Sequence, residues 1–443
     1  MFESIHSRID GRDAHSVADS LETLIRDGRL LPGARVPTVR GLAKGLGLSP
    51  TTVAAAYRML RLRGVLKGEG RNGTFVSARP PVSQPRPDLV VPEGLQDLAA
   101  GNPDPHFLPS LRPALGALDA KPRLYGTPPD HPELVRLALR SLAADDLPKG
   151  DLAIVGGAMD GVERVLQARL RPGDPVAVED PGYTAVFDLL GALGLAPEPV
   201  PVDDAGMLPH QLEATLKRGV RACIVTPRAQ NPTGAALDTA RARALRALWR
   251  AHPKVFVVED DHAGPVAGAP AFTTIPDGHP AFAIVRSVSK WLGPDLRVAF
   301  LQGDAATVAR VQGRQSLGSG WVSHVLQELV ARLWSSRDTM ARLRRAEAAY
   351  AERRSSLLHA LRDRQIQATG RSGFNVWIGV PEEAAVVAAL GARGWAVRAG
   401  ERYRLASAPA IRVTAASLTP TDAARFASDL AAILRPARRT SMA

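Results

Sequence analysis

Six short runs of almost continuously apolar residues constrain the fold more than any other feature of this sequence. Such runs are typical of parallel β-strands that are buried on both faces of a sheet. Longer segments with helical periodicity, such as Ala240–Arg250, separate them and can form the crossovers that parallel strands require. The pattern predicts an α/β fold with a mainly parallel sheet. The runs are Leu152–Val155, Pro175–Val178, Ala222–Val225, Val255–Val258, Phe282–Val285 and Val298–Leu301.

The region before residue 79 has a different pattern, made of three short helical segments. Thr38 is suited to cap the second helix, which Gly47 closes. Ser49 is suited to cap the third, which runs from Thr51 to about Arg63. The apolar positions at helical spacing that we expect to point inward are Val17, Leu21, Leu24, Ile25, Val39, Leu42, Ala43, Leu46, Val53, Tyr57 and Leu60.

Two of these helices, joined by a Gly-Leu turn, predict a helix-turn-helix. Two strand-like runs around a glycine-rich turn, Val65–Lys67 and Thr74–Val76, predict a β-wing. A winged helix places the N-terminal end of its third helix in the major groove of DNA. The shape alone also fits a small helical domain that binds protein. The candidate DNA contacts are the hydroxyl and arginine side chains of Arg40, Ser49, Thr51, Thr52 and Arg71.

Positive charge is concentrated in the same region. The chain has 443 residues and a formal net charge of +12. Residues 1–80 contain 13 Lys and Arg against 7 Asp and Glu, which is half of the excess. Concentrated positive charge favours a polyanionic partner, because each neutralised phosphate releases counterions. A well-solvated basic surface would have the same composition, so charge alone does not decide between them.

The N-terminal motifs resemble the GntR family of DNA-binding regulators. Residues 28–43 read GRLLPGARVPTVRGLA, residues 46–53 read LGLSPTTV, and the wing reads GTFV at 73–76. The resemblance covers nearly all of residues 13–78 and implies a winged helix that binds double-stranded operator DNA. Relatives often have Arg or Asn at the position of Pro50 and a second Arg at that of Ala54, so the resemblance does not transfer an operator sequence.

The composition between these regions predicts a division into three parts. Residues 79–95 are proline-rich, and such a segment forms a semi-stiff linker rather than a helix. We therefore expect a winged helix-turn-helix domain in residues 1–78, a linker in 79–95 and a large domain in 96–443.

The single cysteine, Cys223, excludes a disulfide within one chain and a cysteine zinc cluster. Because it lies in an apolar run, we expect it in the core, and we expect no metal. The N-terminus lacks an apolar signal core, and no run approaches the roughly 20 apolar residues that cross a bilayer. These features predict a soluble cytoplasmic protein with no membrane partner.

Four motifs in the large domain each follow a predicted strand. Lys290 comes just after one, where burial and nearby positive charge would lower its pKa and let its amine add to an aldehyde. The glycine-rich turn at 156–161 opens a helix that suits a phosphate. Asn231 begins an Asn-Pro-Thr-Gly turn, and Asp260 lies in an acidic strand end. Taken singly, Lys290 also fits an exposed lysine, the two turns fit ordinary turns, and the acidic strand end fits a metal site or a solvated strand end. Their shared place at carboxyl ends of strands favours one ligand site.

Together the motifs resemble the fold-type I aminotransferases, from about residue 96 to 435. The resemblance implies a small C-terminal α+β subdomain and a pyridoxal 5'-phosphate site. In that family the lysine forms an aldimine, which corresponds to Lys290, and Asp260 and Asn231 correspond to the partners of the ring nitrogen and ring oxygen. Arg412 corresponds to the arginine that clamps a substrate carboxylate. The other implied cofactor contacts are the stacking Tyr183, the phosphate-binding Ala158, Met159, Ser287 and Arg297, His262 beside the ring, and Tyr125 lent by a neighbouring subunit.

Three positions depart from that family's pattern. His262 stands where many relatives have tyrosine, and it can still hydrogen-bond the ring oxygen. Trp291 replaces a small residue and either narrows the pocket or belongs to the core. Ala229 replaces a polar residue found in several regulators of this type.

A GntR-like winged helix fused to an aminotransferase-like domain describes the MocR family of bacterial regulators. The resemblance implies a transcriptional regulator that senses pyridoxal phosphate, or a small amine or amino acid, as a head-to-tail, domain-swapped homodimer. Two alternatives stay open. One is a working aminotransferase with an accessory DNA-binding arm, and the other is a constitutive DNA binder with a vestigial large domain.

Overall fold

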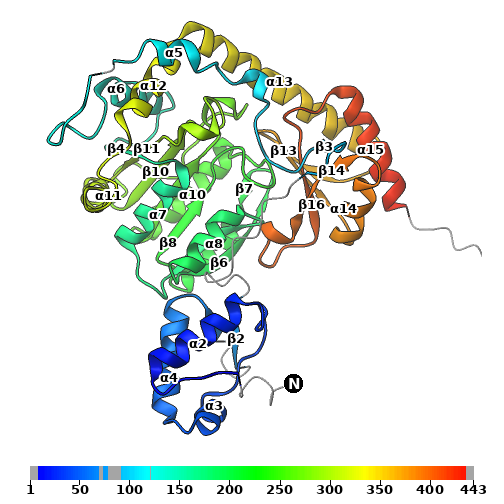
Figure 1. Ribbon diagram of the computed structural model, residues 1–443. Helices are drawn as coiled ribbons and strands as arrows, with labels where there is room; N and C mark the ends of the chain where they lie inside the picture. Colours follow the sequence, from blue (N-terminus) through cyan, green and yellow to red (C-terminus); the bar gives the residue numbers. More distant parts are fainter. Residues whose placement is uncertain (1–7, 69–72, 78–90, 120, 436–443) are drawn as a thin grey trace, which may run out of the picture. The chain divides into compact units, whose positions relative to one another are not determined.

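The structure, a computed structural model, describes residues 8–68, 73–77, 91–119 and 121–435 (Figure 1). Its element order shows a helix-turn-helix with a small hairpin, then a large α/β part and a C-terminal α+β subdomain, which confirms the predicted fold class. Within the described residues, no helix combines the length and apolar character needed to cross a bilayer.

The three predicted N-terminal helices are present, and the second and third have the predicted capping residues. The Thr38 hydroxyl accepts a hydrogen bond from the Gly41 N–H at 3.1 Å, and Gly47 ends the helix with a φ of 65°. The Ser49 hydroxyl accepts from the Thr52 N–H at 3.0 Å. These side chains satisfy N–H groups that a helix start leaves unpaired. The helices are α2 (Ala14–Arg26), α3 (Val39–Leu46) and α4 (Pro50–Leu62).

All the expected inward side chains of these helices pack into one apolar core, although Val39 and Leu46 are only half buried. The buried Tyr57 donates a hydrogen bond from its hydroxyl to the Pro37 carbonyl oxygen at 2.7 Å. This bond satisfies the polar end of a ring that otherwise fills the core.

The wing is an antiparallel hairpin of β1 (Leu66–Gly68) and β2 (Thr74–Val76). The segment that precedes α3 also pairs with it, because Arg35 forms an isolated bridge with Phe75. The wing is therefore tied to the backbone just before the helix-turn-helix.

An eight-stranded sheet in the order β4-β11-β10-β9-β8-β5-β6-β7 forms the base of the large part. All six predicted strands belong to it, and β8, β9 and β10 are buried along their whole length, as strands covered on both faces are. The predicted strands are β4 (Asp151–Val155), β5 (Pro175–Asp180), β8 (Ala222–Val225), β9 (Phe256–Asp261), β10 (Phe282–Ser287) and β11 (Ala299–Gly303).

Two strands of this sheet were missed, β6 (Ala196–Asp203) and β7 (Gly206–Met207). The sequence of β6, APEPVPVD, has a proline at every second position and no apolar run. Proline cannot donate to a strand ladder and is therefore read as a signal against a strand. In the sheet, β6 lies close to the edge that β7 closes.

One predicted strand runs in the opposite direction. β9 is parallel to both β8 and β10, but β11 is antiparallel to both β10 and β4. The expectation that Val298–Leu301 is a parallel strand is therefore wrong. The connection between β10 and β11 contains no α-helix and is too short for a parallel crossover. The carboxyl ends of β4, β8, β9 and β10 still meet at one edge.

Helices cover the sheet and close two apolar cores. Cys223 is a free, buried thiol in the core that also contains Trp249, as predicted. Trp291 is buried in the second core, and its Nε1 donates to the Ser287 carbonyl oxygen at 2.8 Å, so it is a core residue. The helices of the large part are α5 (Arg112–Gly116), α6 (Pro132–Ala144), α7 (Ala158–Arg169), α8 (Thr184–Ala192), α9 (Pro209–Lys217), α10 (Thr239–Ala251), α11 (Ala305–Leu317) and α12 (His324–Ser335).

The C-terminal subdomain has a four-stranded sheet in the order β12-β13-β16-β15 and a separate apolar core around Trp395 and Phe426. A short parallel pair, β3 with β14, joins it to the start of the large part. Its elements are β3 (Gln96–Asp97), α13 (Arg337–Arg362), β12 (Ala368–Thr369), β13 (Asn375–Gly379), α14 (Glu383–Gly391), β14 (Trp395–Ala396), β15 (Arg398–Ala399), β16 (Ala410–Thr414) and α15 (Pro420–Leu434).

Candidate functional site

The residues predicted to contact DNA differ in how free their side chains are. Arg40 and Thr51 are exposed, and neither side chain has a hydrogen-bond or ion-pair partner among the described residues. Ser49 and Thr52 instead have their hydroxyl oxygens 2.8 Å apart, so they first position the start of α4. Arg71 lies outside the described residues. The DNA contacts of all five stay predictions.

Lys290 lies just after β10, and its amine faces an environment that favours the neutral form. Its Nζ donates a hydrogen bond to the Gly101 carbonyl oxygen at 2.8 Å and lies 5.7 Å from the centre of the Phe374 ring. Burial, together with the charge of Arg412, lowers the pKa of Lys290 to about 8. Such an amine is partly unprotonated near neutral pH, and the unprotonated form is the nucleophile. Sequence reasoning missed Gly101 and Phe374, because they are distant from Lys290 along the chain.

Arg412, on β16, reaches the same region from the C-terminal subdomain. Its Nη1 donates to Asn231 Oδ1 at 3.2 Å, and its Nη2 donates to the Ala99 carbonyl oxygen. Its Nε is buried and has no hydrogen-bond partner among the described residues. The guanidinium also lies 5.0 Å from the centre of the Tyr403 ring. The structure therefore brings Asn231 and Arg412 together, and leaves a buried donor that suits an anionic ligand.

Asp260, near the end of β9, provides a test of whether a cofactor fits. Its side chain is almost fully buried, and Oδ1 has no hydrogen-bond partner among the described residues. Burial and the charges of Asp261 and Glu179 raise the pKa of Asp260 to about 7. Buried polar atoms are nearly always paired, and an unpaired carboxylate is costly. A ring nitrogen that carries a proton would satisfy Oδ1, so this residue fits pyridoxal phosphate.

A buried ion-pair network next to Asp260 was missed by the sequence reasoning. Arg228 donates from Nε and Nη2 to the two oxygens of Asp261 at 2.9 and 2.8 Å, and Arg286 donates from Nε at 2.7 Å. Arg286 also pairs with Asp145 at 2.7 Å. Burial alone would raise the pKa of Asp261, but the two arginines hold it well below its usual range. The network fixes the end of β9 and thus the direction of Asp260.

Three of the four predicted phosphate-binding residues lie at the start of α7 or reach it. Ala158 and Met159 are the first two residues of that helix, whose N-terminus carries partial positive charge. Arg297 Nη2 donates to the Gly156 carbonyl oxygen at 3.2 Å, so this arginine reaches the same turn. A Cβ on Gly157, where φ is 107°, would lie 2.6 Å from Arg297 Nη2. A side chain at 157 would strain the backbone and push the guanidinium of Arg297 away from the turn.

Ser287 ends β10 on the chain segment that leads to Lys290. Its hydroxyl oxygen lies 2.9 Å from that of Ser289 and accepts from the Ser289 N–H at 3.1 Å. Ser289 was not predicted as a site residue, although the Ser-x-Ser-Lys motif contains it. The paired hydroxyls place a second polar group beside the predicted one.

Charged groups of this site shift the pKa values of both Tyr183 and His262. Burial and the charge of Asp260 raise the pKa of Tyr183. Burial and the charge of Lys290 lower the pKa of His262 to about 4, so its ring is neutral near pH 7. A neutral imidazole has one donor and one acceptor nitrogen, which suits contact with a ring oxygen.

Tyr125 is the predicted site residue that stands apart. Its side chain is 93% exposed and packs edge-on against Trp321, with ring centroids 5.7 Å apart. No contact among the described residues joins it to Lys290 of the same chain. Its assignment to a neighbouring subunit's site stays a prediction. The described residues also contain no cluster of three or more His, Cys, Asp and Glu side chains that could hold a metal.

Comparison with known proteins matches both parts of the chain. Residues 13–76 match the family described as bacterial regulatory proteins, gntR family, and residues 94–430 match aminotransferase class I and II. The vitamin B6 salvage pathway transcriptional repressor PtsJ of Salmonella typhimurium is 39% identical over 426 residues, which covers 95% of this chain and 98% of that protein. The chain is a MocR-type regulator of the GntR family.

The MocR-type regulator is also similar to the HTH-type transcriptional regulator TauR of Rhodobacter capsulatus, with 30% identity over 83% of this chain and 84% of TauR. Its large part is similar to the crystal structure of Pyrococcus horikoshii kynurenine aminotransferase. The TM-score is 0.70 at 22% identity, over 77% of this chain and 91% of that one. At this identity the likeness shows the aminotransferase fold alone.

Proposed function

We propose that this MocR-type regulator binds pyridoxal 5'-phosphate in its large domain and changes its affinity for operator DNA in response. The response would be to the cofactor, to a small amine or amino acid, or to both. The observation that carries the proposal is the buried Asp260 oxygen, which has no partner among the residues that the structure describes, in a chain that also has a winged helix. The similarity to a vitamin B6 salvage repressor supports a vitamin B6 ligand.

The chain's own residues have distinct tasks in this proposal. When bound, the cofactor supplies an aldehyde that reacts reversibly with amines, and Lys290 is the amine that the chain offers. Arg412 would orient the carboxylate of an amino-acid effector through paired N–H groups. The residues that would hold the cofactor are Asp260 at the ring nitrogen, Asn231 and His262 at the ring oxygen, Tyr183 on the ring face, and Ala158, Met159, Ser287 and Arg297 at the phosphate.

Binding of this ligand changes DNA affinity only if two arrangements of the protein bind it differently. The test is a binding titration of the DNA upstream of the regulator's own gene, with and without pyridoxal phosphate and candidate amines. We expect the affinity of the unaltered protein to change several-fold with ligand, and that of Lys290→Ala to stay constant. Lys254→Ala, at an exposed lysine of the same domain, is the matched control. A normal ligand response in Lys290→Ala would disprove the proposal.

We also propose that the regulator acts as a homodimer. Several large apolar side chains of the α5, α11 and α12 region are exposed: Leu115, Leu124, Tyr125, Leu317 and Val325. Tyr125 contacts Trp321, which lies between α11 and α12, and large exposed apolar side chains in neighbouring segments are consistent with an interface. A second copy would cover these side chains, and two linked winged helices would read paired half-sites. Leu317→Asp with Val325→Asp should give a monomer by light scattering, and a dimer of unchanged mass would refute this.

A second candidate function is amino-group transfer, because the residues implied for catalysis are all present. Lys290, Asp260 and Asn231 lie in the large α/β part and Arg412 in the C-terminal subdomain, with the contacts given above. Sustained turnover of an amino-acid donor, together with no affinity for the upstream DNA, would favour an aminotransferase over a sensor.

A further inference from the structure

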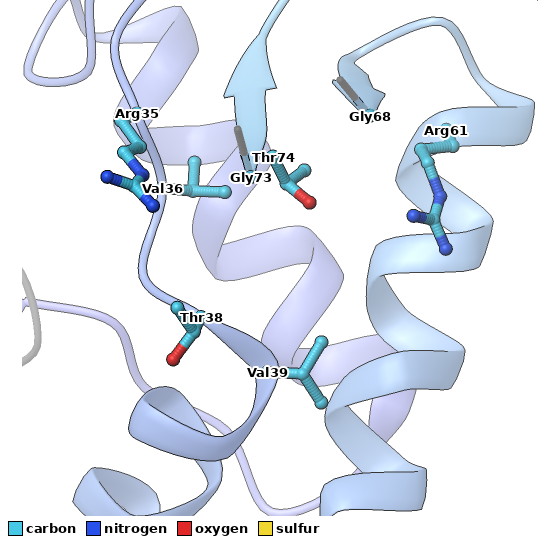
Figure 2. A pocket seen from close by; sticks show the side chains of 8 residues that line it. All are labelled: Arg35, Val36, Thr38, Val39, Arg61, Gly68, Gly73 and Thr74. Carbon is cyan, nitrogen blue, oxygen red and sulfur yellow. The ribbon is translucent and has the colours of Figure 1, made fainter. Parts of the chain in front are cut away.

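We infer that a hollow in the winged helix, between the wing and α4, holds a phosphodiester group of the DNA backbone. This inference rests on the proposed DNA binding and assigns to it two residues that were not among the predicted DNA contacts, Arg35 and Arg61. The hollow has a volume of about 510 Å³ and is lined by the segment before α3, by α4 and by both strands of the wing (Figure 2).

The charged side chains that line the hollow are both positive, and no acidic group of the described residues neutralises them. Arg35 and Arg61 flank it on opposite sides in Figure 2, and both side chains are exposed. Neither guanidinium has a hydrogen-bond or ion-pair partner among the described residues, and the described lining contains no acidic side chain. Two unpaired like charges beside one hollow repel each other, and an anion between them would offset that repulsion.

The start of α3 adds to this field. Its N-cap residue Thr38 and first residue Val39 both line the hollow. The Thr38 hydroxyl is already used by the Gly41 N–H, so it serves the helix rather than a ligand. A helix N-terminus carries partial positive charge and unpaired N–H groups, both of which attract phosphate.

The wing fixes the backbone of Arg35 and lies against one side of its side chain. Its backbone bridges Phe75, and its guanidinium lies so close to Gly73 that a Cβ there would be 3.0 Å from Nε. A side chain that is already positioned loses less conformational freedom when it binds. The arrangement therefore suits a fixed phosphate contact better than a freely moving surface arginine does.

The identity of the anion follows from the geometry of a winged helix on DNA. If the start of α4 lies in the major groove and the wing reaches the adjacent groove, the sugar-phosphate strand that separates the two grooves must pass between them. We place that strand beside the hollow, which is lined by the wing, by the start of α3 and by Arg61 near the C-terminal end of α4. Guanidinium groups match phosphate oxygens with paired N–H donors. Such a contact strengthens binding without reading base sequence.

The test uses the full-length regulator, its upstream DNA and an unrelated duplex of equal length, with affinity measured over a range of salt concentrations. Arg35→Gln with Arg61→Gln should weaken binding to both duplexes by about tenfold or more, because charged hydrogen bonds are lost. The slope of log affinity against log salt should fall by about one for the phosphate contact that is lost. Arg35→Lys with Arg61→Lys keeps the charge and should keep most of the slope.

The matched control removes equal charge elsewhere in the same domain, as Arg12→Gln with Arg29→Gln. Circular dichroism of each variant checks that the winged helix is folded. The inference is wrong, and the proposed function stands, if the variant with both Arg35→Gln and Arg61→Gln binds DNA as this control does. The same holds if that variant loses affinity for the upstream DNA but not for the unrelated duplex. Failure of the unaltered protein to bind either duplex would overturn both.

Discussion

The environment of Lys290 predicts how fast the regulator takes up an aldehyde ligand at each pH. At pH 7 a lysine with a pKa of about 8 is about one-tenth neutral, whereas a lysine at the ordinary value of 10.5 is about 0.03% neutral. Only the neutral amine adds to an aldehyde, and the neutral fraction of Lys290 is about 300-fold that of an ordinary lysine, which sets the upper limit of the gain in uptake rate because a less basic amine is also less nucleophilic. Burial is the larger cause, and the positive charge of Arg412 is the second.

The assay is stopped-flow absorbance of cofactor-free regulator mixed with pyridoxal phosphate, from about pH 6 to about pH 10. The rate should rise with pH and level off above the pKa of about 8, because the amine is then fully neutral. Arg412→Gln removes a positive charge, so the charged form of Lys290 becomes less unfavourable and the midpoint should move to higher pH. Arg412→Lys keeps the charge and should keep the midpoint.

Two results would refute this reasoning. One is a rate that keeps rising to the highest pH, as we expect for Nα-acetyl-lysine, whose ε-amine is unmodified, measured in parallel. The other is an unchanged midpoint in Arg412→Gln. Lys254→Ala, which removes an exposed amine, should match the unaltered protein and shows that the signal comes from Lys290.

Three further predictions test other contacts. Asp261→Asn breaks a buried ion-pair network and should cost about 3–5 kcal/mol of unfolding free energy in urea, whereas the exposed Asp277→Asn should cost little. Gly157→Ala should weaken pyridoxal phosphate binding several-fold in a titration, because its Cβ would push the Arg297 guanidinium away from the turn, whereas Gly173→Ala, with a similar positive φ and open space, should not. Ser49→Ala removes a helix cap and should destabilise the winged helix by about 1 kcal/mol in thermal unfolding, and equal stability would contradict the capping role.

Much of the fold could be predicted because local signals determine it. The caps Thr38 and Ser49 and the turn glycine Gly47 mark helix ends through interactions with their immediate neighbours. Strand direction is different, since β11 was assigned to the parallel set although its pairing with β4 and β10 is antiparallel. Direction depends on which strands become neighbours, and an apolar run has the same appearance in either direction.

The candidate site could be predicted only as a set of chain positions. Lys290, Asn231 and Arg412 were each placed by a motif, but their partners were not. The Gly101 carbonyl that accepts from Lys290, and the Ala99 carbonyl that accepts from Arg412, belong to a segment with no motif. Contacts between distant parts of a chain leave no periodic signal, so only the folded structure reveals them.

The acidic end of β9 shows what the structure adds to a motif. Successive side chains of a strand point to opposite faces, so Glu259 and Asp261 share one face and Asp260 has the other. Glu259 accepts from the Thr273 and Thr274 hydroxyls at 2.9 and 2.7 Å, and two arginines hold Asp261. Folding thus supplies partners for the outer two carboxylates and leaves Oδ1 of the middle one unpaired.

An unpaired buried carboxylate destabilises the chain unless a ligand completes it. We therefore expect Asp260→Asn, which removes the buried charge at nearly constant shape, to leave the cofactor-free protein as stable as before or more stable. The same change should reduce the rise in melting temperature that pyridoxal phosphate produces, because the partner of its ring nitrogen is weakened. Thermal unfolding with and without the cofactor measures both effects. If Asp260→Asn instead destabilises the cofactor-free protein and leaves the cofactor-induced rise intact, then Asp260 has a structural role and does not hold the ring.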